Sequence, residues 1–484
     1  MSGPRVDAPA PPRAAPDSIA AAAEALLLAA IAWGAFAFGA VYEWAWRPLA
    51  VAVALCGLAG LFVSAPGLSS RTRPFGIRGL TLALGAVLLG ASLQLVPVPL
   101  STLDAVSPHA TTLLRDIDPV FASGVLARHP LSIAPSATVT GLALASSFTL
   151  LLAGSARLFS VRGARRFATG VAMVGALLAL DGIVQRPLFT GRIYGFWTPE
   201  GKGIPFGPFV NRNHFAGWML MGLPLTLGLL CAGLAREMRG VAPHWRARVI
   251  WFSSPAANRL LLLTAAAALM ALSLVLTLSR SGIAAMFAAF TLTAFAVVRH
   301  QASTRRRAVV LACLAMVFVA AVGWAGVGVV MERFAAPDWT ELGDRPRAWA
   351  DARDVIADFP LVGTGLNTYG GATVFYRRHA PDVHYVEAHN DYIQLAAEGG
   401  LLVGVPAACA IALLISAVRR RFADDRDASA TAYWLRVGAS AGLVAIALQE
   451  MLDFSLQMPG DAVMFAALCG VALHRAPARR DLLP

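Results

Sequence analysis

The sequence contains few charged residues. Asp, Glu, Lys and Arg make up 14% of its 484 residues, compared with about 25% in soluble domains. Hydrophobic residues make up 57% of the chain, and its mean hydropathy is +0.64. This composition excludes an ordinary soluble domain and indicates a protein that lies in a membrane.

Cysteine is scarce as well, and its placement limits the chemistry. The five cysteines all fall within long apolar runs, at Cys56, Cys231, Cys313, Cys409 and Cys469. We therefore expect neither a disulfide framework in the outer loops nor a thiol nucleophile.

Familiar metal and nucleotide motifs are missing. The sequence has no phosphate-binding loop, no HExxH motif and no Cys/His metal set. Two DxD pairs occur, Asp116 with Asp118 in a polar segment and Asp425 with Asp427 beside arginines. We interpret both pairs as solvated charge, and we predict neither a metal nor a cofactor.

Lysine is nearly absent, since Lys202 is the only lysine among 40 basic residues. The net charge of +12 raises the possibility of a nucleic-acid partner. However, the basic residues are dispersed at the ends of apolar runs and form no single patch. We therefore predict contact with membrane lipids and no nucleic-acid partner.

What the sequence has in abundance is apolar runs long enough to cross a bilayer. The first run is longer than the hydrophobic region of a signal peptide, about 7–15 residues, so we expect it to be retained. We predict twelve spans, at Ile19–Val41, Pro48–Ala65, Gly79–Val96, Thr138–Phe159, Phe167–Gln185, Phe215–Ala235, Leu260–Leu278, Gly282–Val298, Ala308–Val330, Leu401–Val418, Leu435–Phe454 and Gly460–Leu473.

These spans divide the chain into five parts. Residues 1–18, rich in Pro, Ala and Arg, are expected to be a disordered cytoplasmic N-terminus. Spans 1–9 occupy 19–330, a large loop occupies 331–398, spans 10–12 occupy 399–474, and 475–484 form a cytoplasmic tail. The predicted fold class is an all-α polytopic membrane protein with about twelve transmembrane helices.

The distribution of basic residues orients this arrangement. If the N-terminus is cytoplasmic, the inner segments carry 26 basic residues and the outer segments carry 14. Because cytoplasmic loops are enriched in Arg and Lys, this bias predicts that both termini are cytoplasmic. Besides the short segment 42–47, the outer segments are then 97–137, 186–214, the turn 279–281 and the loop 331–398.

The loop 331–398 is the most polar part of the chain. It contains the stretch GDRPRAWADARDVIADFPLVGTGLNTYGG, which predicts a helix after Asp344 that ends at Pro360. A second helix is expected to begin near His389, with Asp391, Gln394 and Glu398 along one side, and to run into the tenth span. We interpret the loop as a helical cap over the bundle that carries the active site.

Two short motifs at the outer ends of spans are candidate anion sites. In GPFVNRNHFAG, the residues Asn211, Arg212, Asn213 and His214 stand where an anion could meet a helix N-terminus. Ordinary capping of the helix is the alternative. In LTLSRSG, Arg280 lies between two spans with almost no loop, and either a phosphate site or contact with lipid headgroups explains it.

His389 in EAHNDYIQLAAEGG is the strongest single candidate for catalysis. An imidazole with a pKa of about 6.5 can take a proton from a hydroxyl group near neutral pH. A structural, hydrogen-bonded histidine is the alternative. The neighbouring Asn390 and Asp391, beside an arginine-bearing helix, favour the functional interpretation.

Taken in order, GPFVNRNHFAG, LTLSRSG, RPRAWADARDVIADFPLVGTGLNTY and AHNDYIQLAAEGGLLVG resemble the O-antigen ligase and O-antigen polymerase-like superfamily. The resemblance covers residues 205–410 by motif. It implies a GT-C-like inner-membrane glycosyltransferase with a large helical periplasmic loop. Such an enzyme moves a glycan from a polyprenyl (undecaprenyl) diphosphate carrier to an acceptor hydroxyl on the periplasmic side, without a metal.

The resemblance also assigns roles to residues. It implies that His389 is the catalytic base of an inverting displacement, and that Arg280 with Arg345 or Arg347 binds the diphosphate. Arg212 lies at the edge of the same site. Asn213, His214, Asn390 and Asp391 are expected to support it.

The acceptor and the class of protein stay open at this point. A glycan, a lipid A-core and a protein hydroxyl are all possible acceptors, so a ligase, a polysaccharide polymerase and a protein glycosylase share this prediction. A transporter or channel for a small anion or a polysaccharide, with Asp181 and Glu450 as intramembrane carriers, is the alternative function. A non-catalytic membrane scaffold is a third possibility. The carboxylates Asp181, Glu450 and Asp453 are costly at span positions unless they are paired.

Overall fold

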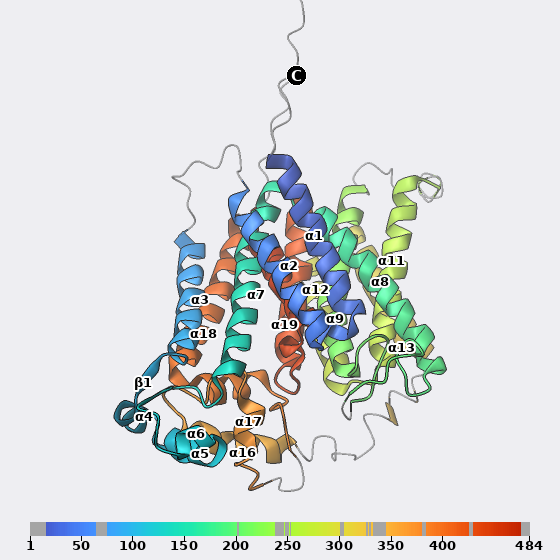
Figure 1. The fold of residues 1–484 in the computed structure, drawn as a ribbon. Coiled ribbons are helices and arrows are strands. Elements are labelled where there is room, and N and C mark those ends of the chain that lie inside the picture. Colours follow the sequence, from blue (N-terminus) through green and yellow to red (C-terminus); the bar gives the residue numbers. More distant parts are fainter. Residues whose placement is uncertain are drawn as a thin grey trace, which may run out of the picture.

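The computed structural model is a bundle of long helices with short elements gathered at one end (Figure 1). It describes residues 16–63, 75–200, 203–237, 246, 251, 253–300, 304–325, 328, 331–332, 345–379, 384–424 and 429–475. Most of the predicted N-terminal segment 1–18 and of the tail 475–484 lies outside these residues. The long helices are α1 (Pro16–Phe36), α2 (Glu43–Phe62), α3 (Phe75–Leu93), α7 (Pro135–Arg162), α8 (Arg165–Leu188), α9 (Arg212–Glu237), α11 (Pro255–Leu276), α12 (Arg280–His300), α13 (Thr304–Ala325), α18 (Asp391–Asp424), α19 (Ala430–Gln449) and α20 (Pro459–Leu473).

Each of the twelve predicted spans overlaps one of these helices. Within the described ranges, nine helices are long and apolar enough to cross a membrane. Two more, Arg78–Leu93 and Pro459–Leu473, are apolar but shorter. The polytopic helical membrane fold is therefore confirmed, whereas the count of twelve spans stays a prediction.

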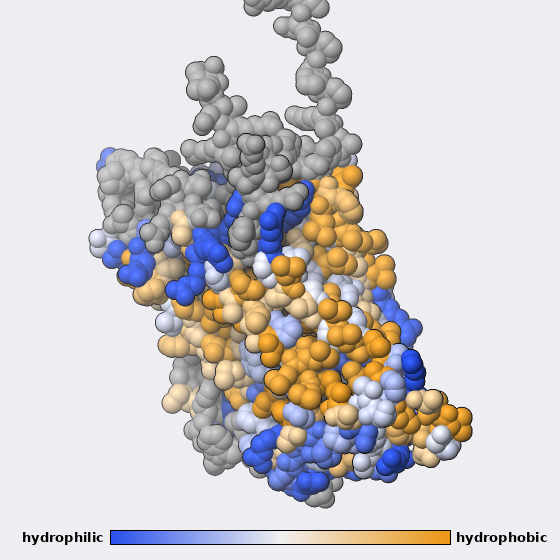
Figure 2. Space-filling view, turned by 90° about the vertical axis from the view of Figure 1, so that its left-hand side faces the viewer, coloured by the Kyte–Doolittle hydropathy of each residue, from blue (hydrophilic) through white to orange (hydrophobic). Residues whose placement is uncertain are grey.

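Helix α9 lies at the centre of the bundle. Its sequence is apolar on every side, which is typical of a fully enclosed helix, and 94% of its apolar window is buried. Helices at the periphery instead expose apolar side chains, as Figure 2 shows for the hydrophobic flank between two more polar ends. On α3 and α18, for example, Leu82 is 74% exposed and Leu401 is 58% exposed. Such a flank suits contact with lipid chains.

Two segments that are far apart in the sequence build one layer at the end of the bundle (Figure 1). We call it the end layer, and it consists of β1 (Pro97–Pro99), α4 (Leu100–Val106), α5 (Pro108–Ile117), α6 (Pro119–Ala122), β2 (Arg128–Pro130), α16 (Arg345–Asp358) and α17 (Tyr369–Thr373). Its apolar core joins side chains such as Leu114 and Phe121 of the first segment to Val355 and Phe359 of the second. The strands β1 and β2 pair antiparallel, so the expected all-α fold carries one short ribbon here.

Gln94 fastens the end layer to the bundle. It follows α3, is fully buried, and donates from Nε2 to the carbonyl oxygens of Val362 at 2.7 Å and Glu398 at 2.8 Å. Its Oε1 accepts from the backbone N–H of Leu366 at 3.0 Å. Because buried polar groups need partners, one side chain thereby fixes the loop that the sequence GTGLNTYGG predicts.

Helix α18 changes direction at Gly400, where φ is 52° and ψ is −155°. The N–H groups freed by this break at Leu401 and Leu402 donate to carbonyl oxygens of residues 360 and 361, both at 2.9 Å. Gly363 stands against the break with φ of 67°, and a Cβ atom there would lie 2.2 Å from the carbonyl oxygen of Glu398. Only glycine fits both positions. The first turns of α18 thus join the end layer, and the rest joins the bundle.

The loops that carry candidate residues all meet at the end of the bundle that bears the end layer. Helix α1 begins at the opposite end (Figure 1), and the helices then alternate in direction. The connections after α8, α11 and α19 therefore lie on the end-layer side. This arrangement agrees with the predicted grouping of 97–137, 186–214, 279–281 and 331–398 on one side of a membrane.

Candidate active site

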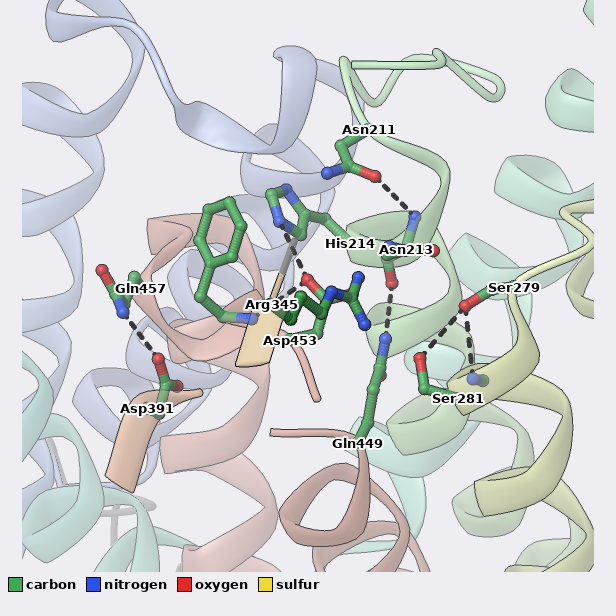
Figure 3. Close-up of polar contacts among 12 residues, drawn as sticks. Asn211, Asn213, His214, Ser279, Ser281, Arg345, Asp391, Gln449, Asp453 and Gln457 are labelled. Atoms are coloured by element: carbon green, nitrogen blue, oxygen red, sulfur yellow. Dashed lines mark hydrogen bonds and ion pairs between the residues drawn. The ribbon is translucent and has the colours of Figure 1, made fainter. Parts of the chain in front are cut away.

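The candidate site is organised around a buried carboxylate, Asp453, in the turn between α19 and α20. Its Oδ2 lies 3.8 Å from Nη2 of Arg345, the first residue of α16. Its Oδ1 lies 3.8 Å from Nε2 of His214 on α9, and both side chains are almost fully buried. Figure 3 shows the carboxylate between the guanidinium group and the imidazole. Three distant parts of the chain therefore converge on one charge.

The position of this turn corrects the predicted eleventh span. The span was expected to run to Phe454, but α19 ends at Gln449. The turn 450–458, which contains the short helix η3 (Ser455–Gln457), was not among the expected outer segments. The apolar residues Met451, Leu452 and Phe454 extended the hydropathy run past the real end of the helix. Glu450 and Asp453 consequently lie at the bundle end and not within a span.

His389 lies on the other side of Phe454. The phenyl ring meets the imidazole of His389 with centroids 4.8 Å apart and that of His214 with centroids 4.7 Å apart, both edge to face. Burial, together with the positive charge of Arg345, lowers the pKa of His389 to about 4. The imidazole is therefore neutral at neutral pH, which is the form that accepts a proton.

The backbone presents His389 in an uncommon conformation. It has φ of 50°, in the left-handed region that non-glycine residues seldom adopt. Asn390 follows and caps α18, since its Oδ1 accepts from the N–H groups of Tyr392 at 3.0 Å and Ile393 at 3.1 Å. Trp349 on α16 donates from Nε1 to the carbonyl oxygen of Ala388 at 2.9 Å. His389 is thus held between two helices, two residues before α18.

A second pair of acidic groups supports the start of α18. Nε2 of Gln457 donates to Oδ1 of Asp391 at 2.6 Å, and the backbone N–H of Asp391 donates to the carbonyl oxygen of Glu450 at 3.1 Å. The buried carboxyl groups of Asp391 and Glu450 lie close together. Burial first, and then the charge of Asp391, raises the pKa of Glu450 well above its usual range. Glu450 is the group that we assign as protonated.

The NRNH motif was interpreted either as part of an anion site or as an ordinary helix cap, and its residues divide between the two roles. Asn211 caps α9, because its Oδ1 accepts from the N–H of Asn213 at 2.9 Å. Asn213 and His214 instead lie against the end of α19 and the turn after it: Nε2 of Gln449 donates to the carbonyl oxygen of Asn213 at 2.8 Å, and the Asn213 side chain lies near the carboxylate of Asp453. The motif is both a helix cap and one wall of the site.

Arg280 is the first residue of α12. Leu278 before it has φ of 55°, and Ser279 caps the helix by accepting from the N–H of Gly282 at 3.2 Å. A Cβ atom on Gly282 would lie 2.8 Å from Cβ of Ala216, so the start of α12 packs against the first turns of α9. Arg280 therefore lies at the same end of the bundle as His214.

The two remaining arginines lie differently. Nε of Arg347 donates to the carbonyl oxygen of His379, whose Nδ1 lies 2.9 Å from the buried Asp351. Arg347 thus orders the end layer, whereas Arg345 faces Asp453. Arg212 lines a separate cavity of about 240 Å³. Leu278, the residue before the cap of α12, lines the same cavity.

Residues that matter in this geometry escaped the motif search. Asp453 and Glu450 drew notice only as costly carboxylates near span ends, while Gln449, Phe454 and Gln457 gave no signal. Asp118 of the first DxD pair caps α6, accepting from Val120 N–H at 2.8 Å. Within the ranges that the structure covers, no group of three or more His, Cys, Asp or Glu side chains is placed to hold a metal.

Unsatisfied polar atoms mark this region among the described residues. Most buried side-chain oxygen and nitrogen atoms without a hydrogen-bond partner belong to residues of this end of the bundle, namely His214, His389, Gln449, Glu450, Asp453, Ser455 and Asp461. Folded proteins leave few such atoms unpaired, so a cluster of them calls for water or a polar ligand.

Comparison with known proteins agrees with this geometry. Residues 265–408 match the family model of O-antigen ligase. The match contains Arg280, Arg345, Arg347 and His389, and it ends before Asp453. No curated protein matches the chain. The family supports a glycosyltransferase of the ligase or polymerase kind that acts on lipid-linked glycans. Residues 265–408 of this chain are therefore similar to O-antigen ligase, and the chain has the long apolar helices of a multi-pass membrane protein.

Proposed function

We propose that this chain transfers a glycan from a polyprenyl diphosphate carrier, undecaprenyl diphosphate in a bacterial inner membrane, to an acceptor hydroxyl on the periplasmic side. The observation that carries the proposal is the convergence of Arg345, His214 and His389 on Asp453 and Phe454 at one end of a membrane bundle. A cation that can hold a diphosphate and a neutral base lie together there, and these are the two groups that the reaction needs.

The arginines bind the leaving group in this mechanism. A guanidinium fork binds phosphate oxygens with two parallel hydrogen bonds and stabilises the negative charge that builds up as the diphosphate departs. We assign Arg345 to this role ahead of Arg347, because Arg347 bonds to the carbonyl of His379. Arg280 at the start of α12 is the second diphosphate ligand, and Arg212 lies at the edge.

His389 acts as the general base. It removes the proton of the acceptor hydroxyl while the acceptor oxygen bonds to the anomeric carbon and the bond from that carbon to the diphosphate oxygen breaks. The displacement is a single step, so the anomeric configuration inverts. The proton stays on the imidazole and is released to water, and the polyprenyl diphosphate leaves with its charge on the arginines. This chemistry needs no metal.

Donor binding prepares the base. Burial, and to a smaller extent the positive charge of Arg345, holds the pKa of His389 at about 4, which makes the imidazole a weak base. A diphosphate bound to Arg345 would offset that charge and raise the pKa toward its usual value of about 6.5. Asn390 and Asp391, held by the turn 450–458, keep the imidazole in place during this change. We therefore expect an ordered reaction in which the donor binds first.

The placement of the polar groups favours an enzyme over a transporter or channel. Transporters hold substrate near the middle of the membrane, often on broken helices. Here the convergent groups lie at the end of the bundle, and Asp181 is hydrogen-bonded to Gln185 at 2.9 Å on its own helix. A glycan, a lipid A-core and a protein hydroxyl all remain candidate acceptors.

The test is transfer by the purified full chain from a synthetic undecaprenyl diphosphate glycan to a panel of these three acceptors. We expect one acceptor to become glycosylated, with release of undecaprenyl diphosphate, inversion of the anomeric centre and full activity in EDTA. Retention of configuration would contradict the single displacement. Export of the intact lipid-linked glycan without bond cleavage would point to a transporter.

A further inference from the structure

A second cavity lies at the opposite end of the bundle from the end layer. It has a volume of about 590 Å³ and lies between the central helix α9 and the helices α8 and α11, which Figure 1 shows at the right of the bundle. It is formed by the first turns of α8, the last turns of α9 and the first turns of α11. No step of the proposed transfer uses it.

The walls of this cavity are apolar and open to the side of the bundle. Ala172, Leu229 and Leu263 line its depth. Met173 and Leu262 also line it and are 63% and 72% exposed, so this apolar flank suits contact with lipid chains. An acyl chain from the bilayer can therefore enter without crossing a polar barrier.

The mouth of the cavity is strongly basic. Arg165, Arg236 and Arg259 line it, together with a single carboxylate, Glu237. Glu237 pairs with Arg236, with Oε1 2.6 Å from Nη2. Arg236 and Arg259 both lie close enough to Arg165 to repel its charge, and Glu237 lies close enough to attract it. Arg165 and Arg259 are therefore left facing the cavity with no ion-pair partner among the described residues.

The sequence of the connection between α9 and α11 is basic as well. Between α9 and α11 the chain contains three further arginines and no Asp or Glu, at Arg239, Arg246 and Arg248. Guanidinium groups bind phosphate oxygens bidentately, and basic pockets between spans suit anionic headgroups. The apolar walls thus suit an acyl chain, and the basic mouth suits the anionic headgroup to which such a chain is joined.

We infer that this cavity binds an anionic phospholipid, with its phosphate on Arg165 and Arg259 and one acyl chain between α8 and α11. The lipid lies in the leaflet on the side of the chain termini, opposite the glycosyl-transfer site. It is a bound structural lipid of the bundle, and its binding does not depend on the proposed reaction.

The test uses native mass spectrometry of the purified full chain with added phosphatidylglycerol. We expect one tightly bound lipid in the wild type and about thirtyfold weaker binding in the Arg165→Gln/Arg259→Gln double variant, since each cation near a lipid surface contributes about a factor of five. Arg166→Gln is the matched control, because Arg166 neighbours Arg165 on α8 but does not line the cavity. It should bind the lipid like the wild type.

Three results would overturn the inference. Equal retention of phosphatidylcholine would show that the charge has no part in binding. Equal thermal stabilisation by inorganic phosphate would identify an ion site without a lipid. Undiminished lipid binding by the double variant would place the lipid elsewhere. Thermal unfolding without lipid, compared across the variants, separates loss of the site from loss of the fold.

Discussion

Nη2 of Arg345 lies 3.8 Å from Oδ2 of Asp453, and Asp453 is completely buried. The separation is longer than that of a close ion pair, so the guanidinium group keeps the capacity to bind another anion. The same carboxylate lies 3.8 Å from His214. Asp453 therefore orients Arg345, which we propose binds the diphosphate, without saturating its guanidinium group.

Replacement of Asp453 by Asn should disturb the orientation of Arg345 without preventing donor binding. The amide keeps the size of the side chain but cannot hold Arg345 by charge, so we expect transfer to fall by about 10- to 100-fold with little loss of donor binding. Transfer rates and donor affinity in membranes matched for protein amount test this. Asp358→Asn, which affects a carboxylate bonded to Tyr376 within the end layer, is the control. A wild-type rate in the Asp453 variant would remove this residue from the site.

His389→Ala and His389→Gln should both abolish most transfer. Loss of a general base costs about 10²–10⁴-fold, and Gln cannot accept a proton at neutral pH. Donor binding should persist, because the arginines hold the diphosphate. His384→Ala should transfer normally, since this exposed imidazole is bonded to the carbonyl oxygen of Gly370, within the end layer. A Gln variant as active as the wild type would show that His389 only positions the substrate.

The dependence of kcat/KM on pH should report the protonation of Asp453. Burial raises its pKa to about 6, with the charge of Arg345 opposing that rise. The carboxylate therefore gains its proton, and Arg345 loses its anchor, as the pH falls through about 6. His389 is lowered to about 4 in the free enzyme, so it stays neutral over that range. We expect the acidic limb of kcat/KM near pH 6.

In the Asp453→Asn variant the acidic limb should move to lower pH, toward the titration of His389 near 4. The measurement is kcat/KM for the donor from pH 4 to 8 in both proteins, because this ratio reports the free enzyme. A limb that stays at the same pH in the variant would assign it to another group. A limb near 6.5 in both would indicate a histidine of ordinary pKa.

Arg280→Lys should impair transfer although it preserves the charge. Lysine lacks the planar fork that binds phosphate bidentately, so we expect a loss of about 10-fold or more at unchanged protein level. Arg299→Lys, at the other end of α12, is the matched control and should be neutral. Full activity of the Arg280 variant would reduce this residue to a contact with lipid headgroups.

The orientation in the membrane can be tested with single cysteines. Ser123→Cys, exposed beside α6 in the end layer, should react with an impermeant thiol reagent in cells whose outer membrane is permeabilised. Arg420→Cys at the other end of the bundle should be protected until the inner membrane is opened. The reverse pattern would invert the predicted topology. Accessible labelling of both sites would show that the inner membrane had been breached.

The sequence by itself determined the elements and several of the candidate residues. Apolar runs predicted the long helices, because burial in lipid depends on local hydrophobicity alone. The cap and proline signals of α16 and the start of α18 are equally local, so the observed bounds 345–358 and 391 lie close to those expected. The motifs also identified Arg345 and His389, which the structure brings to the two sides of Phe454.

Only the tertiary structure decided how these pieces combine. The joining of 97–134 with 345–397 into one end layer, and the clamp at Gln94, depend on contacts between segments hundreds of residues apart. No local pattern records such contacts. Our proposals that Arg345 rather than Arg347 binds the diphosphate, and that Asp453 orients it, rest on the turn that begins where α19 ends. The sequence did not reveal that turn, because its apolar residues extend the hydrophobic run of the span before it. Its place beside α9 and α16 is set by the packing of the whole bundle.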